Sequence, residues 1–306
     1  MTQRREFLKM VAATSVVSLA NTASAANEDA KYIDAHVHVW TPDTNRYPLA
    51  AGFQKKDMVP ASFTPDELFA HCRPHGVGRI VLIQMSFYKF DNSYMLDVIA
   101  EHPGVFSGVG IVDENRSDLH AAIKSLAAKG VRGFRLYTDK QKAESWIDSA
   151  AMKNMWSYGA DEGLAMCLLA NPDALPAVRR LCEMFPKTRV VIDHFARIGV
   201  SGKIESADLD NLCRLADFAN VYVKTSAFYA LGLKKSPYTD LADMVRKLRD
   251  AYGPKRLMWA TDCPYQVQGN HNYQDSVALI RDRLDFLSAA DKDWLLRGTA
   301  EKVFFS

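Results

Sequence analysis

Cysteine is scarce in this 306-residue chain and follows no recognisable pattern. The five cysteines lie far apart, their number is odd, and no Cys-x-x-Cys pair occurs. These facts exclude the disulfide framework of a small secreted domain, a zinc ribbon and a thioredoxin-like redox motif. We interpret most of them as small core residues: Cys72, Cys167, Cys182, Cys213 and Cys263.

The chain also lacks a hydrophobic run long enough to serve as a membrane anchor. Its apolar stretch at about residues 10–20 is too short for a bilayer core of roughly 30 Å. Arg4 and Arg5 precede this stretch and Ala23-Ser24-Ala25 follows it, which is the order of an export signal. We therefore expect residues 1–25 to be a cleavable signal peptide of the twin-arginine type. That signal predicts export by the twin-arginine machinery and a periplasmic mature protein without a stable membrane anchor.

An excess of charge of either sign is missing as well. The chain has 38 basic and 36 acidic residues, and the chain without residues 1–25 has 35 of each. Nucleic acids and anionic membrane surfaces are bound by concentrated positive charge, which this balance does not provide. A small molecule is therefore the expected partner.

No Gly-x-Gly-x-x-Gly follows an early strand, which argues against a dinucleotide-binding doubly wound sheet. Short β-branched runs alternate with helical patterns throughout residues 26–306, and such alternation produces parallel strands. Eight units in this length favour the α/β class and a single (β/α)8 TIM-type barrel. The expected strands are Tyr32–Val39, Arg79–Gln84, Phe106–Val112, Val131–Leu136, Leu164–Leu169, Arg189–Ile192, Val221–Thr225 and Arg256–Ala260. The expected helices include Asn115–Lys129, Pro172–Phe185 and Tyr273–Leu287.

The first expected strand carries a His-x-His pair. Because side chains alternate along a strand, Asp34, His36 and His38 are expected to share one face, opposite the aliphatic face that contains Ile33 and Ala35. Two imidazoles on one face can bind a metal or polarise a carbonyl. The alternative is a strand with two merely hydrogen-bonded histidines.

Polar residues also fall at the ends of most other expected strands. In a barrel of this type the chemistry lies at the carboxyl ends of the strands, so these side chains are expected to converge on one mouth. Any one of them alone could instead be a helix cap, a surface ion pair or a satisfied core group. They are Gln84, Arg135, Asp193, His194, Thr225, Ser226 and Asp262.

Two of these residues have the most specific chemistry. Asp262 follows the last strand, where a carboxylate can act as a general base, although it could be only an acidic turn residue before Pro264. Arg135 lies in a strand, where it needs an anion such as a substrate carboxylate, or an internal salt bridge instead. Arg197 and Tyr47 are further candidates for substrate binding.

With these residues identified, the chain from Tyr32 to its end resembles the amidohydrolase superfamily. Within that superfamily it is similar to the amidohydrolase-related group, which includes sugar-acid lactonases and 2-pyrone-4,6-dicarboxylate lactonase. The motifs that carry the resemblance are Ile33-Asp34-Ala35-His36-Val37-His38, Val131-Arg132-Gly133-Phe134-Arg135, Val191-Ile192-Asp193-His194, Val221-Tyr222-Val223-Lys224, Trp259-Ala260-Thr261-Asp262-Cys263-Pro264 and Gly298-Thr299-Ala300-Glu301-Lys302-Val303-Phe304.

The resemblance implies roles for His36, His38, His194 and Asp262, which would either hold one divalent metal, most readily zinc, or polarise a carbonyl directly. Members with two metals usually place a lysine or acid on the fourth strand and a histidine on the fifth. This chain has Arg135 and then Leu168-Leu169-Ala170-Asn171 at those places, which argues against a two-metal site. The metal-free dicarboxylate lactonases use arginines to bind carboxylates, so Arg135 favours an anionic lactone.

Together these observations predict an exported hydrolase that opens a carboxylate-bearing lactone or cyclic ester with Asp262 as the general base. Three other functions stay open. They are a single-zinc hydrolase with the same site, a non-oxidative decarboxylase, and a periplasmic protein that binds a dicarboxylate without turning it over.

Overall fold

The computed structural model describes residues 31–306, so the predicted signal peptide lies outside the described residues. Eight parallel strands form one sheet in the order of the chain, which confirms the expected barrel of the α/β class. The strands are β1 (Tyr32–Val37), β2 (Val77–Ile83), β3 (Phe106–Gly110), β4 (Val131–Thr138), β5 (Ala165–Ala170), β6 (Arg189–Ile192), β7 (Val221–Thr225) and β8 (Leu257–Trp259). Each lies within two residues of its expected bounds.

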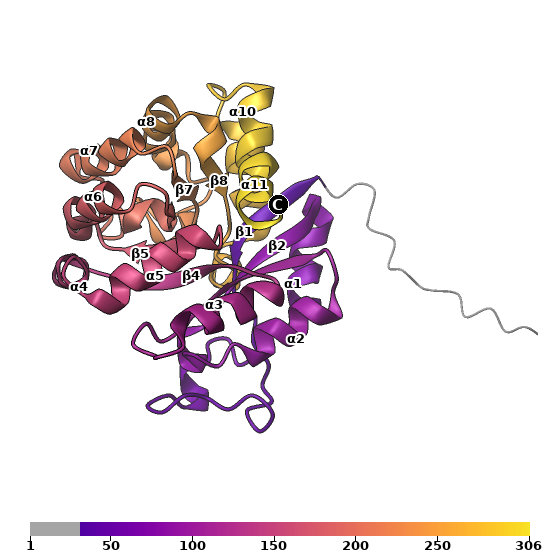
Figure 1. Cartoon of the computed structure of the whole chain (residues 1–306). Coiled ribbons are helices and arrows are strands. Elements are labelled where there is room, and N and C mark those ends of the chain that lie inside the picture. The colour runs from indigo at the N-terminus through magenta and orange to yellow at the C-terminus, as the bar shows by residue number, and fades with distance from the viewer. Residues whose placement is uncertain (1–30) are drawn as a thin grey trace, which may run out of the picture.

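Helices surround the strands (Figure 1). Figure 1 shows α4, α6, α7 and α8 along one side of the sheet and α1, α2 and α3 along another. Their bounds are α1 (Pro65–Cys72), α2 (Ser93–Glu101), α3 (Leu119–Ala128), α4 (Lys140–Trp146), α5 (Ala150–Asp161), α6 (Leu175–Met184), α7 (Ser206–Arg214), α8 (Ala242–Tyr252), α9 (Tyr273–Ala278), α10 (Ala289–Asp293) and α11 (Thr299–Phe304). The expected helix over Tyr273–Leu287 is shorter, because α9 passes into a π-helical turn at Leu279–Arg283. Within residues 31–306, no helix has the length and apolar character needed to cross a bilayer.

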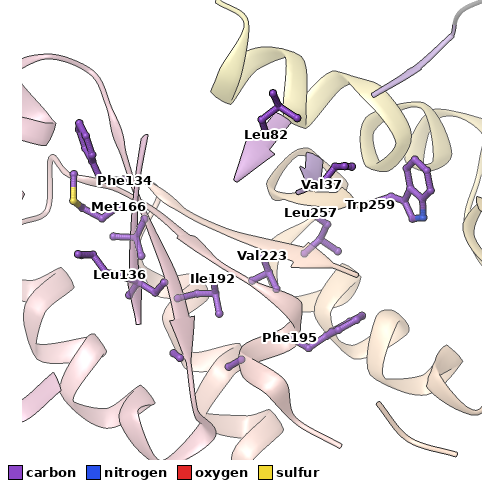
Figure 2. Close-up of a cluster of buried hydrophobic side chains, with 14 of the residues drawn as sticks. Val37, Leu82, Phe134, Leu136, Met166, Ile192, Phe195, Val223, Leu257 and Trp259 are labelled. Atoms are coloured by element: carbon purple, nitrogen blue, oxygen red, sulfur yellow. The ribbon is translucent and has the colours of Figure 1, made fainter. Parts of the chain in front are cut away.

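Two hydrophobic clusters lie on the two sides of the strands. Figure 2 shows part of the outer cluster, in which side chains such as Phe134, Val223 and Trp259 project from the sheet. The inner cluster fills the barrel with small and branched side chains from seven of the eight strands. It is completed by Val303 and Phe304 of α11, which closes the barrel at the end where the strands begin.

A β-bulge in β1 changes which side chains face the barrel interior. Asp34 pairs with Ile80 and Val37 with Leu82, so three steps along β1 oppose two along β2. Such an extra residue reverses the alternation of side chains. Ile33 therefore belongs to the inner cluster and Val37 to the outer one.

The bulge corrects one expectation, because Asp34 does not share a face with the two histidines. Its carboxylate accepts hydrogen bonds from Thr261 N at 2.9 Å, Thr261 Oγ1 at 2.5 Å and Tyr273 Oη at 2.7 Å. Burial raises the pKa of Asp34 to about 6 despite these donors. Asp34 thus joins β1 to the segment that follows β8.

Backbone hydrogen bonds beyond the end of β8 close the ring. Asp262 N donates to His36 O at 2.9 Å, and His38 N donates to Cys263 O at 2.8 Å. Together with the Asp34–Thr261 contacts, these bonds form the closing seam of the barrel. The seam is built by the same residues that carry the predicted site chemistry.

We expect Thr261→Val to lower the free energy of unfolding by about 1–3 kcal/mol, because it removes one donor from a buried carboxylate. Urea denaturation at pH 8, where Asp34 is ionised, measures the change. Thr225→Val is the matched control, since its buried hydroxyl donates to a neutral carbonyl, Met258 O. Equal losses in the two variants would contradict a special role for the seam.

Candidate active site

The carboxyl ends of the strands bring the four predicted residues together. Asp262 Oδ1 lies 3.2 Å from His38 Nε2, 3.4 Å from His36 Nε2 and 3.7 Å from His194 Nε2. All four side chains are buried. The predicted convergence is therefore present for these four residues, whereas Thr225, which donates to Met258 O, does not line the mouth.

Left-handed backbone positions two of these side chains. His194, Phe195, Ala196 and Arg197 have φ angles of 51°, 53°, 54° and 60°, and Asp262 has a φ of 70°. Each such residue costs roughly 1–2 kcal/mol when it is not glycine. Strain of this kind gathers at sites where the surrounding structure fixes a functional side chain. Here the turn directs His194 and Arg197 into the same cavity.

Hydrogen bonds fix the orientation of two imidazoles. His38 Nδ1 donates to Ile83 O at 2.8 Å, which leaves Nε2 directed at Asp262. Ser226 Oγ donates to Lys224 O, so His194 Nδ1 donates to Ser226 Oγ at 2.8 Å. Both rings thus turn an unprotonated Nε2 toward Asp262, where it can accept a proton or bind a cation.

His36 lies between two cations and two carboxylates. Its Nδ1 is 3.2 Å from Lys224 Nζ and 3.4 Å from Asp193 Oδ1. Its Nε2 is 3.2 Å from Arg135 NH1, and Asp262 lies on the same side. Either neutral tautomer has one donor and one acceptor partner in this arrangement. Burial and the Lys224 charge hold the pKa of His36 well below its usual value, so the ring is neutral.

The carboxyl of Asp262 is ionised at neutral pH. Burial alone would raise its pKa, but the neighbouring imidazoles, His194 foremost, hold the pKa well below its usual range. Burial in turn lowers the pKa of His194 to about 4. At neutral pH the site therefore combines an ionised Asp262 with a neutral His194.

Two residues of the site were not predicted as participants. Lys224, fully buried, lies 3.0 Å from Asp193 Oδ1, and its charge holds the pKa of Asp193 well below the usual range although burial opposes this. Tyr229 donates its hydroxyl to Asp262 Oδ2 at 2.6 Å. The apolar strand around Lys224 signals a buried cation, whereas no sequence pattern marks the loop position of Tyr229.

A cavity of about 830 Å³ opens above these residues. Arg135 and Arg197, the two arginines expected to bind substrate, line this cavity. Arg135 is partly balanced by Asp193, with Nε 3.8 Å from Oδ2, whereas Arg197 donates to a neutral amide, Asn171 Oδ1, at 2.7 Å. Among the ion pairs of residues 31–306, none involves Arg197.

Tyr47 requires a correction, because it is not among the residues that line this cavity. Its hydroxyl donates to Asp97 Oδ2 at 2.7 Å, and its ring packs against Tyr94. The hydroxyl of Tyr47 therefore makes a structural contact with α2.

Comparison with known proteins identifies the family. The family model for amidohydrolases matches residues 33–305. The chain belongs to the amidohydrolase family. An L-fucono-1,5-lactonase of Burkholderia ambifaria is 30% identical over 78% of this chain and 82% of that protein. A 2-pyrone-4,6-dicarboxylate hydrolase of Comamonas testosteroni is 26% identical over 80% of each chain.

A solved structure of an amidohydrolase from Burkholderia multivorans with bound zinc has the same fold as this amidohydrolase. It superimposes with a TM-score of 0.73 at 20% identity and covers 90% of this chain and 99% of the other. At this identity the likeness concerns the fold.

The donor types of the site fit one divalent metal. His36, His194 and Asp262 each offer a ligand atom, and these atoms lie within 4.8 Å of one another. Imidazole and carboxylate are suitable zinc ligands, and His38 Nε2 faces the same oxygen of Asp262. Arg135 competes for this site, because its guanidinium donates to the Nε2 lone pair of His36 that a metal would use.

We expect Arg135→Met to raise the affinity for Zn²⁺ about tenfold or more. The substitution frees the His36 Nε2 lone pair and removes a fixed positive charge beside it. Competition with a chromogenic chelator on metal-stripped protein measures the affinity.

Arg197→Met is the matched control, because it removes a charge from the same cavity but not from an imidazole. The competition between Arg135 and metal is refuted if the two variants bind Zn²⁺ equally or if Arg135→Met binds it more weakly than the parent.

Proposed function

We propose that this amidohydrolase opens a lactone or related cyclic ester that carries a carboxylate. The observation that carries the proposal is the position of an ionised carboxylate, Asp262, within 3.7 Å of three imidazoles. The lactone substrates named for the relatives support it.

In the proposed reaction Asp262 takes a proton from a water molecule, whose oxygen attacks the lactone carbonyl carbon. Arg135, a fixed cation at the cavity floor, stabilises the negative charge that develops on the carbonyl oxygen. The ring C–O bond then breaks, and the departing alkoxide recovers the proton from Asp262. The product is a hydroxy acid, and Asp262 is again ionised.

The cations of the cavity orient an anionic substrate. Arg197 has its guanidinium in the cavity without a carboxylate partner among residues 31–306, so a substrate carboxylate can form a paired hydrogen bond with it. Arg135 lies beside the catalytic groups and can hold the ring or its carboxylate. This arrangement favours an anionic lactone over a neutral one.

A metal-assisted form of the same hydrolysis is the second candidate, and the donor set of His36, His194 and Asp262 favours it. A bound zinc ion would supply Lewis acidity and lower the pKa of its water to near neutrality. The protein residues would retain their roles in holding and orienting the substrate.

Replacing Asp262 by Asn should lower kcat by at least about a hundredfold without unfolding the protein, because the amide cannot accept the water proton. Initial rates on a panel of carboxylate-bearing lactones measure the effect, and circular dichroism checks the fold. Asp97→Asn is the control, since Asp97 is an acid outside the cavity. Unchanged turnover in Asp262→Asn would remove the proposed base, and the same assay after chelation distinguishes the metal-free from the metal-assisted form.

We also propose that the enzyme is exported to the periplasm by the twin-arginine machinery. The support is the order of Arg4-Arg5, the apolar stretch and Ala23-Ser24-Ala25. Sequencing the N-terminus of the periplasmic protein should find Ala26 first, and exchange of both arginines for lysine should leave the protein in the cytoplasm. A cytoplasmic protein that retains its first residues would exclude export.

A further inference from the structure

Exposed hydrophobic side chains gather at the mouth of the active-site cavity. In residues 31–306 only six large hydrophobic residues are strongly exposed, and three of them line this one cavity. Phe90 is 53% exposed, Tyr137 46% and Val200 40%; Phe90 and Val200 lie in the segments that follow β2 and β6, and Tyr137 lies near the end of β4. Apolar side chains gathered at one opening mark a binding surface.

The apolar surface continues from this rim into the cavity. Leu136, Trp146, Met152 and Leu169 line the same cavity, and the first three are nearly fully buried. They belong to β4, α4, α5 and β5, which are neighbours in the barrel. Leu136 and Arg135 are both residues of β4, and both line the cavity.

The polar side chains of the cavity are distributed differently. They lie around Asp262 and on the loop after β3, where Asp113, Glu114 and Asn115 line the cavity. A polyhydroxylated ring would need hydrogen-bond partners on every side, because buried hydroxyls without partners are costly. The side chains of β4, α4, α5 and β5 that line the cavity are mostly apolar, and the exceptions are Arg135, Lys142 and the hydroxyl of Tyr137.

Resting on the proposed lactonase function, we propose that the substrate is amphipathic. The lactone ring and its carboxylate lie on the floor near Arg135 and Arg197, and a bulky apolar substituent of aromatic size lies on the wall of Leu136, Trp146, Met152 and Leu169. The cavity volume of about 830 Å³ is toward the upper end of the ~300–1,000 Å³ typical of sites for drug-sized ligands.

A partner protein on the rim is the other occupant that this patch could have. The continuity of the apolar surface favours a substrate. A partner on the rim would cover Phe90, Tyr137 and Val200, but it would not contact the apolar side chains inside the cavity. A substrate subsite changes the preference among lactones, whereas an interface changes the oligomeric state, and the test measures both.

The test compares a five-membered lactone with a ring carboxylate, its phenyl-substituted analogue and the lactone of a polyhydroxylated aldonic acid. The parent enzyme should have a kcat/KM for the phenyl analogue about tenfold or more above that for the other two, as hydrophobic pockets discriminate. The double variant Phe90→Ser, Val200→Ser should reduce that preference several-fold. Leu233→Ser is the control, since Leu233 is 73% exposed and does not line the cavity.

Calorimetry with the two hydroxy-acid products, with and without phenyl, repeats the comparison for binding alone. If the lactones are opened but neither rate nor affinity favours phenyl, the apolar subsite is wrong and the lactonase proposal stands. If no lactone is opened but the phenyl acid binds more tightly in a Phe90- and Val200-dependent way, the lactonase proposal is wrong and the subsite stands. A dimer that the double variant dissociates, with no phenyl preference, assigns the patch to a second copy of the chain.

Discussion

The closing seam between the first and last strands is the constraint on which the rest of this structure depends. Asp262 N donates to His36 O and His38 N donates to Cys263 O, so the two bonds that close the barrel also set the carboxylate beside the His-x-His pair. Sheet closure removes an exposed edge, and here it also fixes the relative positions of groups from the two ends of the chain. The bulge before His36 contributes to the same result, since it turns the histidine inward while Asp34 remains bonded to Thr261. The residues that close the barrel therefore also assemble the site.

Charge balance within the barrel explains why so many ionic groups can be buried there. Arg135 and Lys224 face Asp193 and Asp262 around a neutral His36, so two fixed positive charges meet two negative ones. Loss of one partner would leave an unpaired charge in a region of low dielectric, which is strongly unfavourable. Lys224 and Asp193 thus hold His36 in place without reaching the cavity lining. Arg135 belongs to both environments, since it is bonded to His36 and lines the cavity.

The regular part of the fold could be predicted from the sequence because it follows from local patterns. Alternating short strands and helices specified the barrel, and polar residues at the strand ends specified His194 and Asp262 as members of one site. The bulge was not predictable, because strict alternation between Asp34 and His36 is the default and only pairing with β2 reveals the extra residue. The prediction that Tyr47 binds substrate was wrong for a related reason, since only the folded chain shows that Asp97 accepts a hydrogen bond from its hydroxyl. Tyr229 lies in a loop whose path no periodicity describes.

The division of the cavity between strands and loops separates chemistry from substrate choice. Its floor consists of strand-end residues whose positions are set by the seam and the buried ion pairs. Its walls combine strand residues such as Leu136 and Leu169 with residues of the connecting segments, among them the exposed Phe90 and Val200. Loops can therefore change without loss of the barrel, which is why one barrel type serves many substrates. In this chain the strained turn from His194 to Arg197 connects the two parts, because both of these residues line the cavity and His194 lies beside Asp262.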